Sequence, residues 1–100
     1  MADLACVIIV EGIDNTQRSL IQGWIKTACE DWWHQLPNVW LAVGQTPGFW
    51  RDGVQPFLLP GNSAMVLAVK NTKGNRWAIV GVKDDDDWFE NHLPPVGVHP

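Results

Sequence analysis

His34 and two serines are the side chains whose chemistry could support nucleophilic catalysis. An imidazole can act as a general base near neutral pH, but the residues around His34 include no serine or cysteine to serve as its nucleophile. Asp31 falls on the opposite side of the expected strand and therefore cannot orient the ring. Ser19 and Ser63 stand outside any nucleophile-elbow motif. These residues favour a core or interface role for His34 and speak against a hydrolase triad.

The cysteines, the acidic run and the glycines lack the spacings of a metal or cofactor site. Cys6 and Cys29 show no metal-type spacing and predict reduced, buried thiols. Residues 84–87 are four aspartates without the glycine and terminal glutamate of a calcium loop, so we expect a solvated charge cluster. The glycines form neither a P-loop nor a dinucleotide fingerprint. The residues by themselves therefore predict no cofactor.

The acidic charge is concentrated near the C-terminus. Residues 84–87 and Glu90 supply five of the eleven acidic residues, so residues 1–83 carry seven bases and six acids. Binding to a phosphate backbone usually requires a basic stripe, and a nucleic-acid partner is therefore disfavoured. The apolar runs are too short to span a membrane, and residues 1–4 do not begin a secretory signal. We expect a cytoplasmic protein with no membrane partner.

The 100 residues, of which 46% are hydrophobic, predict a single domain over residues 1–93 and a flexible tail over residues 94–100. Apolar periodicity and turn residues divide this domain into alternating elements. We expect strands at residues 4–10, 31–35, 38–44, 64–70 and 76–82, and helices at residues 14–29, 46–58 and around Trp88 and Phe89.

Two helix starts carry capping signals. Asp14 with Gln17 three residues later forms a capping box, and Thr46 followed by Pro47 is an N-cap with proline at the first helical position. Gly48, Gly53 and Pro56 weaken the second helix.

The order of elements predicts an α+β ferredoxin-like plait (βαββαβ) with an appended strand and a short C-terminal helix. The helices of such a plait cover one face of the sheet, so strands open to water on the other face should alternate apolar with polar residues. Residues 7–10, 40–43 and 65–69 are instead apolar at successive positions. Both faces are therefore expected to be buried, and a homodimer supplies the cover most simply. The alternative is that the helix with Trp88 and Phe89 folds back over the second face.

The tryptophans indicate which residues would form the interface of this homodimer. The chain has seven, and packing in the core or at an interface explains them better than a base-stacking platform, which would interleave them with lysine or arginine. A two-residue loop at Leu36 and Pro37 would place Trp33 opposite Trp40 on the open face. Trp33 and Trp40 are therefore the predicted interface residues. A three-residue loop would reverse the faces.

Three segments carry a resemblance to a known family. Residues 31–41 read DWWHQLPNVWL, residues 62–69 read NSAMVLAV and residues 87–93 read DWFENHL. In this order they resemble the SinR-like small proteins related to the CRISPR-associated adaptation nuclease and to VapD-type toxins. The resemblance spans roughly residues 4–93 and implies the same plait and a homodimer.

The resemblance also implies a metal site. In nuclease relatives, an acidic residue at the end of the first strand of each subunit holds a divalent metal at the dimer interface. Residues 10–14 read VEGID here and lack the usual aromatic–Asp pair, so Glu11 is the nearest candidate for the catalytic and metal-binding role, with Asp14 as a further metal ligand. Paired carboxylates could hold Mg²⁺ or Mn²⁺ and activate water. The alternative is a solvated Glu11 and a helix-capping Asp14.

Two functions follow from these observations. The first is a small dimeric ferredoxin-like protein that acts as a protein-interaction or scaffold module, with no catalysis required and with a possible protein partner. The second is a metal-dependent nuclease or toxin-like relative of the adaptation nuclease that uses Glu11. The residues favour the non-enzymatic function because Glu11 departs from the family pattern and no basic surface is evident.

Overall fold

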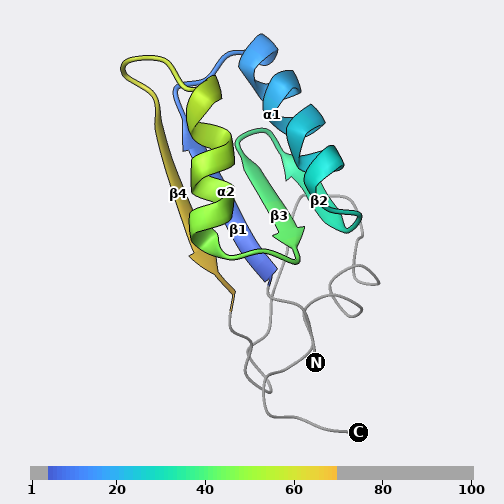
Figure 1. The fold of residues 1–100 in the computed structure, drawn as a ribbon. Coiled ribbons are helices and arrows are strands. Elements are labelled where there is room, and N and C mark those ends of the chain that lie inside the picture. The colour runs from blue at the N-terminus through green and yellow to red at the C-terminus, as the bar shows by residue number, and fades with distance from the viewer. Residues whose placement is uncertain (1–4, 70–100) are drawn as a thin grey trace, which may run out of the picture.

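The computed structural model describes residues 5–69 as an α+β fold (Figure 1). The elements follow the order strand, helix, strand, strand, helix, strand, as expected for this part of the chain. They are β1 (Ala5–Glu11), α1 (Asn15–Ala28), β2 (Trp32–Leu36), β3 (Val39–Val43), α2 (Pro47–Val54), the short 3-10 helix η1 (Gln55–Phe57) and β4 (Ser63–Ala68). The expected strand at residues 76–82, the helix with Trp88 and Phe89, and the boundary between residues 93 and 94 lie outside the described residues.

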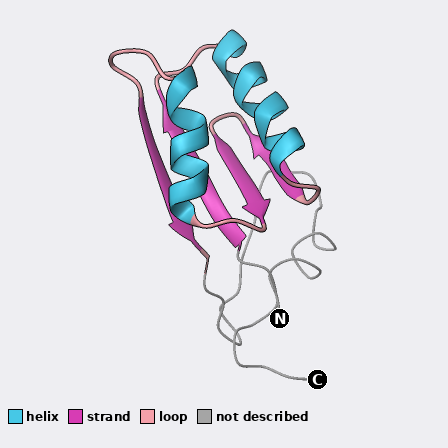
Figure 2. Cartoon of the chain, in the orientation of Figure 1, coloured by secondary structure: helices cyan, strands magenta, loops and turns pink. Residues whose placement is uncertain are grey.

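The four strands form one antiparallel sheet in the order β2-β3-β1-β4. Ile8 at the centre of β1 pairs with Trp40 of β3 on one side and with Val66 of β4 on the other. Because each neighbouring pair is antiparallel, β1 and β2 run in the same direction with β3 between them, and β3 and β4 run in the same direction with β1 between them. Both helices lie on one face of the sheet (Figure 2).

The start of α1 follows the expected capping box. The Asp14 carboxylate accepts a hydrogen bond from the backbone N–H of Gln17 at 2.8 Å, and the Gln17 side-chain oxygen accepts one from the backbone N–H of Asp14 at 3.0 Å. These bonds satisfy two backbone donors around the first helical turn. The helix ends where Cys29 becomes extended, and its buried face presents Ile21 and Ile25 to the sheet.

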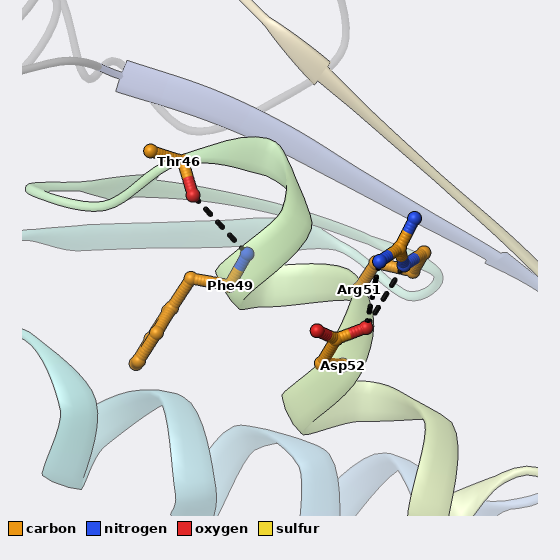
Figure 3. Close-up of polar contacts among 4 residues, drawn as sticks. All are labelled: Thr46, Phe49, Arg51 and Asp52. Atoms are coloured by element: carbon orange, nitrogen blue, oxygen red, sulfur yellow. Dashed lines mark hydrogen bonds and ion pairs between the residues drawn. The ribbon is translucent and has the colours of Figure 1, made fainter.

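The start of α2 also follows its sequence signal. Thr46 Oγ1 accepts a hydrogen bond from the backbone N–H of Phe49 at 3.3 Å (Figure 3). Pro47 is the first residue of the helix. On the surface of this helix, Arg51 and Asp52 form an ion pair at 2.9 Å (Figure 3). Both side chains of that pair are exposed, so it adds little stability.

Gly53 allows α1 and α2 to approach closely. A Cβ atom at this position would overlap the ring of Trp24 on α1. The same indole stacks on Phe49 with ring centroids 5.8 Å apart and meets Trp50 edge-on at 5.4 Å. The glycine that weakens α2 by propensity is therefore required by packing.

The main core lies between the helices and the sheet. Its largest fully buried side chains are Trp40 and Trp50, each 0% exposed. The buried members are Cys6, Ile8, Val10, Ile21, Ile25, Trp40, Ala42, Trp50 and Val54. The apolar residues spaced along α1 and α2 are thus buried against alternate residues of β1 and β3.

The predicted register of the β2–β3 hairpin is wrong. Leu36 pairs with Val39, so the loop consists of Pro37 and Asn38 instead of Leu36 and Pro37. The register then shifts between Trp33 and Leu36, so that Trp33 pairs with Leu41. Such a bulge places two residues of one strand opposite one residue of its partner.

Trp40 consequently lies on the helix side of the sheet, and its predicted place beside Trp33 on the open face is wrong. Leu41 and Val43 lie on the opposite face of the sheet. Trp33 is on that opposite face, as expected, although only 6% of it is exposed. The physical reason is that a shift of one residue in the register moves every following side chain to the other face.

Candidate functional site

The face of the sheet opposite the helices, here called the outer sheet face, is apolar over all four strands. Strand alternation and register place on it Ala5, Val7, Ile9, Trp33, Val39, Leu41, Val43, Met65 and Leu67. The unbroken apolar runs in the sequence therefore produce two apolar faces, as expected. An exposed apolar face of this kind marks an interaction surface more often than isolated surface leucines do.

Exposure changes along the outer sheet face. Trp33 and Leu41 are only 6% and 8% exposed, whereas Met65 and Leu67 on β4 are 52% and 48% exposed. Val7 and Ile9 on β1 are half-buried between these two groups. The part available to another molecule is therefore centred on β4 and the adjacent side of β1.

A shallow depression of about 180 Å³ lies at one end of this exposed part. It is formed where β1 pairs with β4, and Glu11 lies directly opposite Ser63. Its lining consists of Ile9, Val10, Glu11, Ser63, Ala64 and Met65. The candidate carboxylate therefore borders an apolar surface and not a polar cleft.

The two predicted metal-binding acids have different surroundings. Glu11 is exposed at the end of β1, on the same face as Ile9 and Val7. The Asp14 carboxylate is already engaged in capping α1. Among residues 5–69, no group of three or more histidine, cysteine, aspartate or glutamate side chains is arranged to hold a metal ion. Metal binding at Glu11 and Asp14 stays a prediction.

A hydrogen-bond network fixes the end of the sheet that carries Glu11. The buried Gln17 amide donates to the Phe57 carbonyl at 2.8 Å and to Asn62 Oδ1 at 2.7 Å. Asn62 Nδ2 in turn donates to the Gly12 carbonyl at 2.8 Å. Two loops distant in the sequence are thereby tied to the first turn of α1, and Glu11 immediately precedes one of them.

His34 is held by packing against Trp40 and by a hydrogen bond to the backbone. Its ring stacks on Trp40 with centroids 4.3 Å apart and an interplanar angle of 8°. Its Nδ1 lies 2.8 Å from the Val39 carbonyl, which can only accept, so Nδ1 carries the proton of that hydrogen bond. The expected core or interface placement of His34 is consistent with these contacts.

The two thiols are free and poorly suited to nucleophilic chemistry. Burial raises the pKa of Cys6, whose Sγ lies 3.4 Å from the Gln45 carbonyl. Burial is also the largest cause of the raised pKa of Cys29. Because the thiolate is the reactive form, both side chains are protonated and weakly reactive at neutral pH.

No protein family model matches the chain, and searches of curated proteins and of solved structures find no match. The resemblance to SinR-like proteins therefore stays a prediction. None of the helices among the described residues is long and apolar enough to cross a membrane.

Proposed function

We propose that this protein is a small protein-interaction or scaffold module, built on a ferredoxin-like plait, that forms a homodimer through the outer sheet face. The observation that carries the proposal is the exposure of Met65 and Leu67 beside half-buried Val7 and Ile9 on one continuous apolar surface. Fully burying an exposed large apolar side chain contributes about 1.5–3 kcal/mol, and Met65 and Leu67, which are about half exposed, each have about half of that left to gain. Such a surface favours association over exposure to water.

The plait is supported by the connections between strands. Each helix joins two strands that run in the same direction, with a third strand inserted antiparallel between them. These connections are the ones expected of a split βαβ arrangement repeated twice. With both helices on one face (Figure 2), the exposed part of the opposite face, centred on β4 and the adjacent side of β1, is left for a partner.

A second copy is the partner that requires the fewest assumptions. Closed two-fold dimers are the commonest oligomers, and their interfaces are more apolar than the rest of a protein surface. The outer sheet face contributes apolar side chains from every strand, and its acidic residue on β1, Glu11, lies at one end. A self-complementary contact can therefore bury its centre without burying a charge.

The light-scattering mass of wild type and of Leu67→Glu on a sizing column tests this proposal. We expect a wild-type dimer and a folded Leu67→Glu monomer, because the substitution places a carboxylate in the contact. Leu20→Glu is the matched control, since Leu20 is also about half exposed, at 53%, but lies on α1. Dissociation by both variants, or by neither, would contradict an interface on the outer sheet face.

The second candidate is a divalent-metal-dependent nuclease that uses Glu11, with Mg²⁺ or Mn²⁺ as its metal. It is supported by the exposed position of Glu11 on the outer sheet face, where a face-to-face dimer would bring carboxylates from both copies to one interface. Glu11→Ala would then abolish magnesium-dependent cleavage while leaving the dimer intact. Cleavage that persists in this variant would remove Glu11 from the mechanism.

A further inference from the structure

Helix α1 carries two basic side chains on its outward side. Its sequence contains Arg18 and Lys26 and no acidic residue. Among the described residues, the ion pair found is Arg51–Asp52 on α2, so neither base of α1 has a carboxylate partner there. This local charge contrasts with the formal net charge of −4 for the chain.

Arg18 is held in position without being neutralised. Its Nε donates to the Pro37 carbonyl at 2.7 Å, and a terminal nitrogen donates to Asn38 Oδ1 at 3.0 Å. Its other terminal nitrogen donates to Asn15 Oδ1. All three acceptors are neutral, and a guanidinium has five N–H donors, so donors remain for a further acceptor. The orientation of the cation is therefore fixed by the hairpin loop before any ligand binds.

The second cation lies two helical turns further along α1. Lys26 Nζ is 6.0 Å from the ring centroid of Trp32, and the side chain is exposed. The eight residues from Arg18 to Lys26 correspond to about 12 Å along the axis of an α-helix. The two charges thus stand at opposite ends of one face.

A depression of about 260 Å³ lies between these charges and is lined by Arg18, Ser19, Gln22, Gly23 and Lys26. Gly23 is exposed in the middle of the helix, where glycine is less favourable than alanine. A Cβ atom at Gly23 would meet no other atom within 4 Å, so no close packing among the described residues requires it. The missing side chain leaves the helix backbone open to the approach of another chain.

We propose that this depression binds a carboxylate-rich peptide segment of a partner protein, lying along α1. An extended peptide advances about 3.3 Å per residue, so two acidic residues four positions apart are separated by about 13 Å. That spacing matches the separation between Arg18 and Lys26, each of which pairs with one carboxylate. Ser19 and Gln22 are placed to hydrogen-bond the peptide backbone over Gly23. Only two cations line this depression, fewer than binding to a phosphate backbone usually requires, which favours a short acidic peptide over a nucleic acid.

Fluorescence anisotropy with two labelled nine-residue peptides tests this proposal on the full chain. One peptide carries aspartate at positions 3 and 7 in a glycine–serine background, and the other carries asparagine at both positions. We expect the aspartate peptide to bind at least tenfold more tightly at low salt and to lose affinity as salt rises, because exposed charges are screened.

Three variants locate the binding. Lys26→Gln is expected to weaken binding of the aspartate peptide about fivefold, whereas Gln55→Glu, which changes the net charge equally outside the depression, leaves it within twofold. Gly23→Leu fills the depression and is expected to weaken binding about tenfold while the Tm stays equal to or above that of wild type. If Gly23→Leu loses binding while its Tm is not lowered, the substitution acts on the binding site and not on the stability of the fold.

Four outcomes would overturn the proposal. Equal binding of the two peptides, or equal weakening by Lys26→Gln and Gln55→Glu, would remove the cations of α1 as the recognition element. Full affinity in Gly23→Leu would remove the depression. Binding that appears only after the aspartates at residues 84–87 are replaced by asparagine would assign the surface to the acidic run of the chain itself instead of to a partner.

Discussion

The side-chain amide of Gln17 donates a hydrogen bond to Asn62 Oδ1 at 2.7 Å, across 45 positions of the sequence. Asn62 Oδ1 also accepts from the backbone N–H of Leu59 at 2.7 Å. One buried amide therefore joins the first turn of α1 to the loop before β4. The end of the sheet that carries Glu11 depends on this connection for its shape.

Gln17→Ala is expected to lower the free energy of unfolding by about 2–3 kcal/mol, because it removes three side-chain hydrogen bonds and leaves the Phe57 carbonyl without this donor. Urea denaturation measures the change. Gln22→Ala on the outer side of the same helix is the control and should alter stability by less than about 0.5 kcal/mol. Equal effects of the two variants would show that the Gln17 network contributes nothing specific.

The role of Asp14 as a helix cap gives a second prediction. Asp14→Ala should cost about 1 kcal/mol of folding free energy, whereas Asp14→Asn and Asp14→Ser should retain most of it because each keeps a side-chain oxygen for the Gln17 N–H. Denaturant titrations of the three variants provide the comparison. Equal losses for alanine and serine would contradict the capping role.

Two glycines on the two helices should respond oppositely to the same substitution. Gly53→Ala brings a methyl group into the Trp24 ring and should destabilise the fold by about 1–3 kcal/mol, as overpacking does. Gly23→Ala meets no neighbouring atom and should stabilise it by about 0.5–1 kcal/mol through helix propensity. Thermal unfolding followed by circular dichroism reports both. A Tm of Gly53→Ala equal to or above that of Gly23→Ala would contradict the close packing of Gly53 against Trp24.

Burial of the thiols predicts a loss of stability in alkaline solution. Folding raises the pKa values of Cys6 and Cys29 above the ordinary thiol value of about 8.5, so the folded state binds more protons than the unfolded state in that pH range. The stabilisation is complete at neutral pH and declines as the pH rises through about 8.5. Denaturation midpoints measured across this range should decline less in the Cys29→Ala variant, which lacks one contributing group. A midpoint that increases with pH would contradict the direction of these pKa changes.

Local signals in the sequence were sufficient to predict the described elements. Asp14 and Thr46 identify the starts of the two helices because each side chain caps a backbone N–H three residues away. The continuous apolar strands likewise predicted two apolar sheet faces. These features depend on neighbours in the sequence, which a linear pattern contains.

The failures concern contacts that depend on the assembled fold. The bulge between Trp33 and Leu36 has no distinctive residue, and it places Trp40 in the core instead of on the outer sheet face. Gln17 was recognised only as part of a capping box, because its bonds to Phe57 and Asn62 require α1 and the loop before β4 to meet.

The charged surface of α1 was missed for a related reason. Arg18 and Lys26 stand eight positions apart and read as separate surface charges. The depression between them becomes evident only when the helix is formed and Arg18 is anchored on the hairpin loop. The metal-binding roles predicted for Glu11 and Asp14 remain predictions.

Self-association through the outer sheet face is the central claim, and sedimentation equilibrium of the wild-type chain over a range of concentrations tests it most directly. We expect a mass of twice 11.2 kDa that falls toward 11.2 kDa on dilution, and a Met65→Glu variant that stays at 11.2 kDa while retaining its circular dichroism spectrum. A wild-type mass of 11.2 kDa at every concentration would contradict the claim.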